Sequence, residues 1–383
     1  MSAREGYLLA SAAIVASVDA SVELIMKNFL RYCEDVVLDH EQGLAIVSCD
    51  PGRPKWNTVM NTMYDPNPKG GIFVYDYVHK NALRQIRLLG FPSQSDFHPL
   101  GINIYREKGG STRLFVVNHQ RNGSTVDIFD IDYVTSTATF ITSIADNDRH
   151  ILSPNAVSPV SYTSFFVTND HRFIPRKHAF LNMQETTRAL PLGWVTFVDF
   201  SCSPTRFHTA ISGIPFPNGI VVTPTGKEVI VASSSTSHLL IYDRDPISNC
   251  ITYREKIPLQ YRPDNLTFDH SLKPSDPTAF DKDGRFLRGL VSAGHPCIRL
   301  LHAMSRDPSK HAAPSWVVEI RRTPGKAEAP CKATTAEYRG DYYVETLYQS
   351  DGSHFPSSTT GAMDNQRGEL VNPLIPQPEV HAL

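Results

Sequence analysis

Short apolar segments of strand length recur along the chain, and their pattern predicts its architecture. Six segments share one style and begin at residues 43, 113, 164, 228, 286 and 341: GLAIVSCD, RLFVVNHQ, SFFVTNDH, EVIVASSS, FLRGLVSAG and DYYVETLY. Their β-branched and aromatic residues favour buried strands. The spacing is uneven and averages about 60 residues, which lies within the range of β-propeller repeats.

Two other patterns accompany these segments. Several are followed by an alternating strand that closes on Asp, as in GGIFVYDY, STVDIFDID and SHLLIYDRD, which is typical of an outer strand with one wet face. Several are preceded by a Pro-containing strand start: HPLGINIY at residue 98, SPNAVSPV at 153, FPNGIVVT at 216 and RPDNLTFD at 262. CEDVVLDH at residue 33 fills this slot in the first unit, and we expect KATTAEYRG at 332 to fill it in the last.

Each unit therefore supplies an inner strand, a middle strand and outer strands. Units of this kind stack radially in a β-propeller, so the predicted fold is all-β, with six blades around a central tunnel. We expect the propeller to span residues 31–351. Residues 352–383 are predicted to form a tail that is loose or lies on the surface.

Residues 1–30 leave two interpretations open. Their apolar stretch at positions 7–18 suits a weak signal peptide, whereas Glu5 and the short length favour a helix leaning on the domain. This balance favours an intracellular protein over a secreted one. No apolar run in the sequence is long enough to span a membrane.

The composition of the chain limits the kinds of partner that it can bind. A net charge of −2 over 383 residues, with no basic stripe, argues against nucleic acid. The 28 Pro and 22 Gly fit a turn-rich β protein. The six cysteines show no CxxC and no zinc spacing. Cys33 and Cys49 flank a predicted hairpin and could form a disulfide, but we expect buried free thiols. The sequence does not indicate an oligomeric state.

The residues at the start of the inner strands share one chemistry. They are mostly oxygen donors of low total charge: Glu34 with Asp35, Asn155, Asn218, and Asp264 with Asn265, while Leu100 stands at the same position in one unit. Each Asn alone would be ordinary turn chemistry. Together, carboxylates and amide carbonyls suit Ca²⁺, and the absence of His or Cys among them argues against zinc.

These phrases resemble the serum paraoxonase/arylesterase family. The resemblance rests on CEDVVL, LFVVNHQRNGSTVDIFDID, SPNAVSPVSYTSFFVTNDHRF, FPNGIVVTPTGKEVIVA, RPDNLTFD and VSAGHP, in order from residue 33 to 346. SCDPGRPKWNTVM resembles the fungal branch. The family fold is a six-bladed propeller with calcium in its tunnel.

The resemblance implies a ligand set. The catalytic calcium would be held by Glu34, Asn155, Asn218, Asp264 and Asn265. A second, structural calcium would use Asp35 and the Ile102 carbonyl. The family's further Asp is Ala156 here, which puts that second site in doubt.

The resemblance also implies histidines. His119 matches one member of the family's catalytic pair, and Leu100 replaces the other. His98 lies two residues earlier and could share the face of Leu100 on a regular strand. His295 matches a tunnel histidine. Phe97, Phe173, Trp194 and Phe216, with Leu100, are candidate pocket walls.

Three functions follow as hypotheses. Because Leu100 cannot take a proton, the first is a hetero-Diels–Alderase of fungal secondary metabolism, which would join a tropolone-type quinone methide to a sesquiterpene such as humulene. The second is a calcium-dependent lactonase or arylesterase. The third is a propeller without catalytic activity that binds a partner on its rim.

Overall fold

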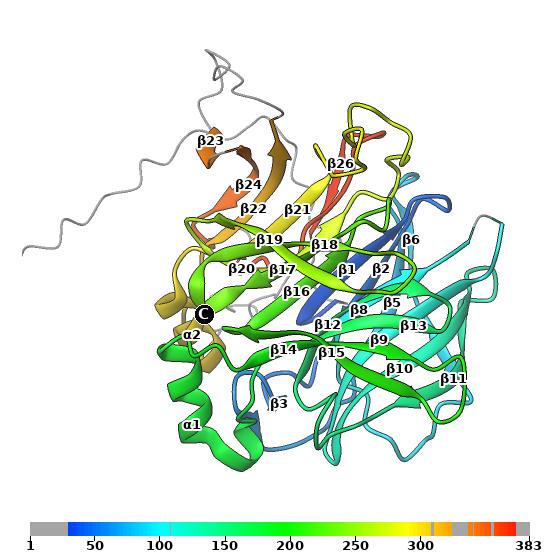
Figure 1. The fold of residues 1–383 in the computed structure, drawn as a ribbon. Helices are drawn as coiled ribbons and strands as arrows, with labels where there is room; N and C mark the ends of the chain where they lie inside the picture. The colour runs from blue at the N-terminus through cyan, green and yellow to red at the C-terminus, as the bar shows by residue number, and fades with distance from the viewer. Residues whose placement is uncertain are drawn as a thin grey trace, which may run out of the picture.

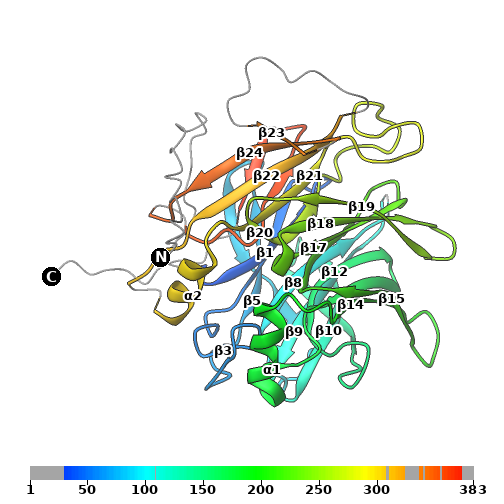
Figure 2. The same ribbon diagram turned by 60° about the vertical axis from the view of Figure 1, so that its left-hand side comes forward.

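The computed structural model describes residues 30–107, 109–307, 310–323, 336–339, 341–353 and 356–372. The two interpretations of the N-terminal segment fall almost wholly outside this range. The described chain is built mostly of strands, and its sheets are arranged around a common axis (Figures 1 and 2). Their pairs are antiparallel except for β7 (Arg87–Leu89) with β11 (Thr137–Ile144). This is the predicted all-β propeller arrangement.

Five sheets of four or five strands make up the described part of the propeller. From the inner to the outer edge, the first sheet contains β1 (Cys33–Asp39), β2 (Leu44–Cys49), β5 (Gly71–Asp76) and β6 (Asn81–Gln85). The second contains β8 (Pro99–Tyr105), β9 (Thr112–Gln120), β10 (Gly123–Asp132), β11 (Thr137–Ile144) and β7 (Arg87–Leu89). The third contains β12 (Pro154–Ser161), β13 (Ser164–Asn169), β14 (Gly193–Asp199) and β15 (Arg206–Ile214).

The fourth and fifth sheets follow the same order. The fourth contains β16 (Pro217–Val222), β17 (Glu228–Ser233), β18 (His238–Arg244) and β19 (Ile251–Pro258). The fifth contains β20 (Arg262–Phe268), β21 (Leu290–His295), β22 (Ser315–Arg322), β24 (Tyr342–Ser350) and β23 (Ala336–Arg339). The other elements are β3 (Trp56–Asn57), β4 (Thr62–Met63), α1 (Pro175–Thr187), α2 (Ile298–Arg306), a short 3₁₀ turn (Ser234–Thr236), β25 (Ala362–Asp364) and β26 (Glu369–Val371).

The sixth predicted unit does not form a sheet of its own. The segment that begins at Asp341 becomes β24, which pairs with β22 in the fifth sheet, and β23 pairs with β24 at its edge. The ring is completed instead by the hairpin β25–β26, since β25 contacts both β20 and β1. The apolar pattern of this segment predicted a strand correctly. It did not predict the neighbouring strand, because pairing depends on where the chain comes back to the sheet in three dimensions.

The chain after residue 352 is also not a loose tail throughout. Ser357, Ser358, Thr360 and Asp364 are fully buried. The hydroxyl of Thr360 donates to the Glu34 carbonyl at 2.9 Å, and the hydroxyl of Thr267 donates to the Gly361 carbonyl at 2.6 Å. This segment therefore fills the gap between the first and fifth sheets.

Apolar clusters fill the spaces between neighbouring sheets. Phe115 and Phe165 meet edge to face at 5.6 Å between the second and third sheets. Phe97 packs at 5.5 Å from Phe91 and 6.3 Å from Phe129 in the cluster between the first and second sheets. These clusters hold the radial order of the sheets and thereby fix the axis.

A disulfide joins Cys33 to Cys49 across the first hairpin, where the two residues face each other in register. The expectation of free thiols was therefore wrong. Both cysteines are buried at the start of β1 and the end of β2. The bond fixes the backbone immediately before Glu34. No helix in the described part of the chain combines the length and apolarity required to cross a membrane.

Candidate metal centre and active site

Each of the five inner strands is irregular at the same place. The register with the middle strand shifts between Cys33 and Asp35 in β1, and equivalent shifts follow the first residue of β8, β12 and β16 and the second of β20. A β-bulge re-aims the side chains of its unpaired residues. The bulged positions are those that the sequence singled out: Glu34, Leu100, Asn155, Asn218, Asp264 and Asn265.

Four of these side chains carry a buried oxygen with no hydrogen-bond partner. The atoms are Oε2 of Glu34 and Oδ1 of Asn155, Asn218 and Asn265. A buried acceptor without a donor is costly, and native proteins rarely leave several together. Hard oxygen atoms in this number suit Ca²⁺, so the residues present fit the predicted ion.

The amide nitrogens of the same residues explain why their oxygens stay free. Asn218 Nδ2 donates to Asp264 Oδ1 at 2.5 Å, and Asn265 Nδ2 donates to Glu34 Oε1 at 2.8 Å. Asn155 Nδ2 donates to Asp170 Oδ2 at 3.2 Å. Each amide thus turns its nitrogen toward a carboxylate and leaves its oxygen unpartnered.

The charge at the centre is also unbalanced. Burial raises the pKa of Glu34 well above its usual range, and the neighbouring Asp35 and Asp264 carboxylates raise it further. The Arg53 guanidinium lowers it, but Arg53 donates its hydrogen bond to the Pro99 carbonyl. No group of three or more His, Cys, Asp or Glu side chains gathers as a metal site within the described ranges. The donor set is instead rich in amides.

At the second predicted calcium site, both carboxylate oxygens of Asp35 already accept hydrogen bonds. Asp35 Oδ2 accepts from the Ile102 amide at 2.8 Å, and Oδ1 accepts from the Val36 amide and the Thr360 hydroxyl at 2.9 and 3.0 Å. Burial raises the pKa of Asp35 to about 7. With Ala156 in place of the family's Asp, Asp35 serves as an acceptor that ties β1 to β8 and to the segment before β25.

His119 stands beside this centre in a defined tautomer. Its Nε2 faces the carbonyl of Pro154 at 2.7 Å and must donate to it, so Nδ1 accepts from the hydroxyl of Thr58. Burial lowers the pKa of His119 to about 4. His119 is therefore a neutral imidazole whose lone pair points at a hydroxyl.

A second pair, Asp170 and His171, was not singled out in the sequence. His171 Nδ1 donates to Asp170 Oδ1 at 2.9 Å, and Asp170 also accepts from Asn155. The Thr186 hydroxyl donates to the Asn182 carbonyl, so His171 Nε2 donates to Thr186 at 2.7 Å. Burial alone would lower the pKa of His171, but the Asp170 carboxylate raises it overall.

A signal for this pair was present in the sequence. Middle strands end beside the start of inner strands, where Asn118 pairs with Pro99 and Asn169 pairs with Pro154. The polar residues that follow, His119 in one unit and Asp170 in the next, must therefore lie at the same end of the tunnel. Reading the ends of the middle strands as well as the starts of the inner strands would have found Asp170.

His119, Asp170 and His171 line one cavity of about 200 Å³. Thr58 and Val59, from the loop that carries β3 and β4, form one wall, and the start of α1 forms another. Both elements lie at the same end of the propeller in Figures 1 and 2. The cavity therefore brings His119 and the His171–Asp170 pair next to the predicted calcium ligands. These ligands, Glu34, Asn155, Asn218, Asp264 and Asn265, form the oxygen ring.

The other two predicted catalytic histidines lie elsewhere. His98 directs Nδ1 to Asp50 at 2.9 Å and Nε2 to the Pro66 carbonyl at 3.1 Å, so both nitrogens are used away from the cavity. The bulge in β8 also breaks the alternation that would have placed it with Leu100. His295 Nε2 contacts Asp264 Oδ2 at 2.7 Å, which positions that predicted ligand.

Some of the residues predicted to form the pocket wall lie near the cavity, and others do not. Leu100 packs among apolar residues of the second and third sheets, and Phe97 belongs to the aromatic cluster described above. Trp194 is buried, and its indole nitrogen donates to Thr196 at 3.2 Å. None of these three lines the cavity beside His119 in the described residues. Phe216 lies 4.6 Å from the His171 ring, and Phe173 lies 5.9 Å from His178 on α1.

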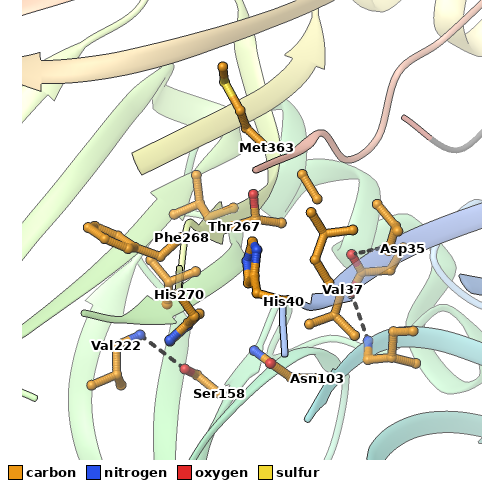
Figure 3. Close-up of a pocket in the computed structure, with 16 residues that line it drawn as sticks. Asp35, Val37, His40, Asn103, Ser158, Val222, Thr267, Phe268, His270 and Met363 are labelled. Carbon is orange, nitrogen blue, oxygen red and sulfur yellow. Dashed lines mark hydrogen bonds between the residues drawn. The ribbon is translucent and has the colours of Figure 1, made fainter. Parts of the chain in front are cut away.

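The opposite end of the axis is nearly closed. Figure 3 shows side chains from all five inner strands and β25 around a space of about 30 Å³, including Asp35, Asn103, Ser158, Val222, Thr267 and Met363. This volume is about that of one water molecule. Of these two spaces along the axis of the described chain, the one beside His119 is therefore the larger.

The sequence is similar to a known family of proteins. The family model described as Arylesterase matches residues 30–275. Serum paraoxonase/arylesterase 2 of Bos taurus is 30% identical over 261 residues, 67% of this chain and 68% of that protein. The Canis lupus familiaris protein of the same name is 28% identical over 211 residues, 54% of this chain and 56% of that protein, so the match spans little over half of its length.

A solved structure, the periplasmic gluconolactonase of Pseudomonas aeruginosa, is 12% identical and overlaps with a TM-score of 0.43, covering 90% of this chain and 88% of that one. At this level of similarity it adds nothing on function. The family match alone covers well over half of the chain, and it includes all five predicted calcium ligands, Glu34, Asn155, Asn218, Asp264 and Asn265. The chain belongs to the arylesterase family.

Proposed function

We propose that this protein is a calcium-dependent hydrolase that acts on small lactones or aryl esters. The observation that carries the proposal is the set of four unpartnered buried oxygens, on Glu34, Asn155, Asn218 and Asn265, beside the cavity that holds His119. We propose that these residues, with Asp264, hold one Ca²⁺ in a six-bladed propeller closed by β25–β26.

A bound calcium ion would supply a Lewis acid that polarises an ester carbonyl. The chain's own residues supply the proton transfer. Because Nδ1 of His119 is an acceptor in the neutral ring, it can take a proton from a water that displaces or bridges the Thr58 hydroxyl. The water oxygen bonds to the carbonyl carbon, and the same proton returns to the leaving oxygen as the ester bond breaks. His171, held by Asp170, lines the same cavity.

The test is hydrolysis of a panel of lactones and aryl esters by purified protein with its calcium content measured. We expect calcium-dependent turnover that falls by about 10²–10⁴-fold in His119→Gln. The matched control is His98→Gln, which removes a buried histidine outside the cavity and should leave the turnover of the folded protein unchanged. A folded, calcium-loaded protein that hydrolyses nothing would contradict the proposal.

A second candidate function is the hetero-Diels–Alder reaction of fungal secondary metabolism. It is supported by one observation: Leu100 is packed among apolar residues, and both nitrogens of the nearby His98 are engaged elsewhere, so the second histidine of the family's pair has no substitute. A cavity that orients two reactants needs no proton transfer. Turnover of a quinone methide with humulene, in the absence of ester hydrolysis, would support this function instead.

A further inference from the structure

The wall of the cavity formed by α1 carries several hydrogen-bond donors. Arg176 and Lys177 lie in the first turn of α1, which contains no acidic residue. The preceding residue, Ile174, supplies no side-chain cap, so the first amides of the helix have no side-chain acceptor from it. α1 is kinked at His178, whose φ and ψ are not helical, so the donors that matter on this wall are side chains and not the helix dipole.

A buried donor on the same helix also faces the cavity. Asn182 is 8% exposed and lines the cavity, and its Nδ2 has no hydrogen-bond partner. An unpartnered buried N–H group carries the full cost of its lost hydration. An acceptor that enters the cavity would remove this cost.

The Arg176 guanidinium is held in place but not neutralised. It lies 5.5 Å above the ring of Trp56, and Nη1 donates to the Arg121 carbonyl at 2.8 Å. No carboxylate lies within ion-pair distance of Arg176 or Lys177 in the described chain. The contact with Trp56 joins α1 to the loop that forms the other wall.

The other charges around the cavity are already paired. Arg121 donates to both oxygens of Asp96, at 2.7 and 2.8 Å. Asp170 accepts from Asn155 and His171. The unpaired charge of the cavity is therefore positive, and it lies on α1.

We propose that this wall is a subsite for a carboxylate of the substrate, bound by Arg176 and Asn182 with Lys177 at the mouth. The proposal deepens the proposed function: the preferred substrates would be esters or lactones that carry a carboxylate some distance from the reacting carbonyl. Arg176 would be a specificity-determining residue, because it selects the substrate without touching the reacting atoms.

The experiment compares phenyl acetate with 4-acetoxybenzoate, which adds only a carboxylate to the same ester. We expect Arg176→Gln to raise the KM for 4-acetoxybenzoate by roughly tenfold, the effect of losing one charge-assisted hydrogen bond. The KM for phenyl acetate should change by less than about twofold. Arg176→Lys should restore part of the difference, and added salt should raise the wild-type KM for the anionic ester only.

Arg188→Gln is the matched control, since it removes the same charge from the exposed C-terminal end of α1. It should leave both KM values unchanged. Equal effects of Arg176→Gln on the two esters, or no preference of the wild type for the anionic ester, would overturn the subsite while leaving the hydrolase intact.

Direct binding separates the two proposals if neither ester is hydrolysed. Calorimetry with 4-hydroxybenzoate on the calcium-loaded protein needs no turnover. Binding to the wild type that is lost in Arg176→Gln would support the subsite although the hydrolase proposal had failed. No binding to the wild type would overturn the subsite.

Discussion

Asn265 donates a hydrogen bond to Glu34 at 2.8 Å, although the two residues are 231 positions apart in the sequence. This bond joins the first inner strand to the fifth and closes the oxygen ring. Asn265 also donates to the Thr360 hydroxyl at 3.0 Å, which ties the C-terminal segment to the same point. The proposed calcium site and the closure of the propeller therefore share the same residues.

Calcium should stabilise the fold through this unit. Calcium at 100 times its Kd would add about 2.7 kcal/mol to the free energy of unfolding. We expect Asn218→Ala to weaken calcium binding and to abolish most of the calcium-dependent rise in Tm. The measurements are calcium content after dialysis and thermal unfolding with calcium or chelator.

Asn103→Ala provides the control for this prediction. Asn103 also lies on an inner strand, where its amide donates to the Val157 carbonyl at 3.2 Å, but it faces the opposite end of the axis. Its replacement should lower the Tm without changing the response to calcium. The same loss of response in both variants would argue against a calcium site at Asn218.

The hairpin β25–β26 should be essential for closure. The Asp364 carboxylate accepts from the Tyr77 hydroxyl at 2.8 Å and from Arg367 Nη1 at 2.6 Å. Asp364→Ala would leave the buried Tyr77 hydroxyl without a partner and should lower the free energy of unfolding by about 1–3 kcal/mol. Glu369→Ala removes only a surface pair with Lys80 and should cost about 1 kcal/mol or less. Urea denaturation compares them, and equal losses would contradict this role of Asp364.

The Cys33–Cys49 disulfide should contribute to stability and to the position of Glu34. It closes a loop with a sequence separation of 16 residues. The entropy that this removes from the unfolded chain predicts a stabilisation of about 3 kcal/mol. We expect Cys33→Ser with Cys49→Ser to lower stability by this order and to weaken calcium binding. Cys202→Ser, at an exposed free cysteine, is the control. Peptide mapping without reductant that finds both thiols free would rule out the bond.

The pH profile of hydrolysis should report His119. Its pKa is lowered to about 4, and a base acts in its deprotonated form, so activity should be retained below pH 6.5 and lost as the pH falls through about 4. The measurement is kcat/KM against pH at saturating calcium. At lower calcium, protons would compete with calcium for Glu34 and would obscure the acidic side of the profile. A limb near pH 6.5 would show that a histidine with an ordinary pKa is the base.

Leu100→His would test whether the cavity lacks a second base. Because Leu100 does not line the cavity beside His119, the substitution should leave kcat for ester hydrolysis unchanged, and a gain would contradict this placement. Leu100 is only 5% exposed in an apolar cluster, so a polar ring there should also cost about 1–3 kcal/mol of stability. Leu100→Met keeps the site apolar and is the control. No gain in turnover by a folded Leu100→His would show that the position does not face the substrate.

The sequence by itself determined the local features of this protein. The apolar segments and their alternation predicted most of the strands, since burial of β-branched residues on a sheet is a local pattern. The Pro-Asn and Arg-Pro-Asp-Asn phrases predicted the oxygen donors, because a bulge at the start of each inner strand repeats with the unit. The sequence therefore placed Asn155, Asn218 and Asp264 at the starts of inner strands, where the structure has the bulges.

Tertiary structure decided everything that depends on partners distant in sequence. The segment at Asp341 could join any sheet with a free edge, and the return of the chain placed it beside β22 rather than in a sixth sheet. His98 and His119 are both histidines at strand ends, yet Asp50 draws one away while Thr58 and the Pro154 carbonyl hold the other in the cavity. Such choices depend on hydrogen bonds between residues tens of positions apart, and periodicity along the chain carries no record of them.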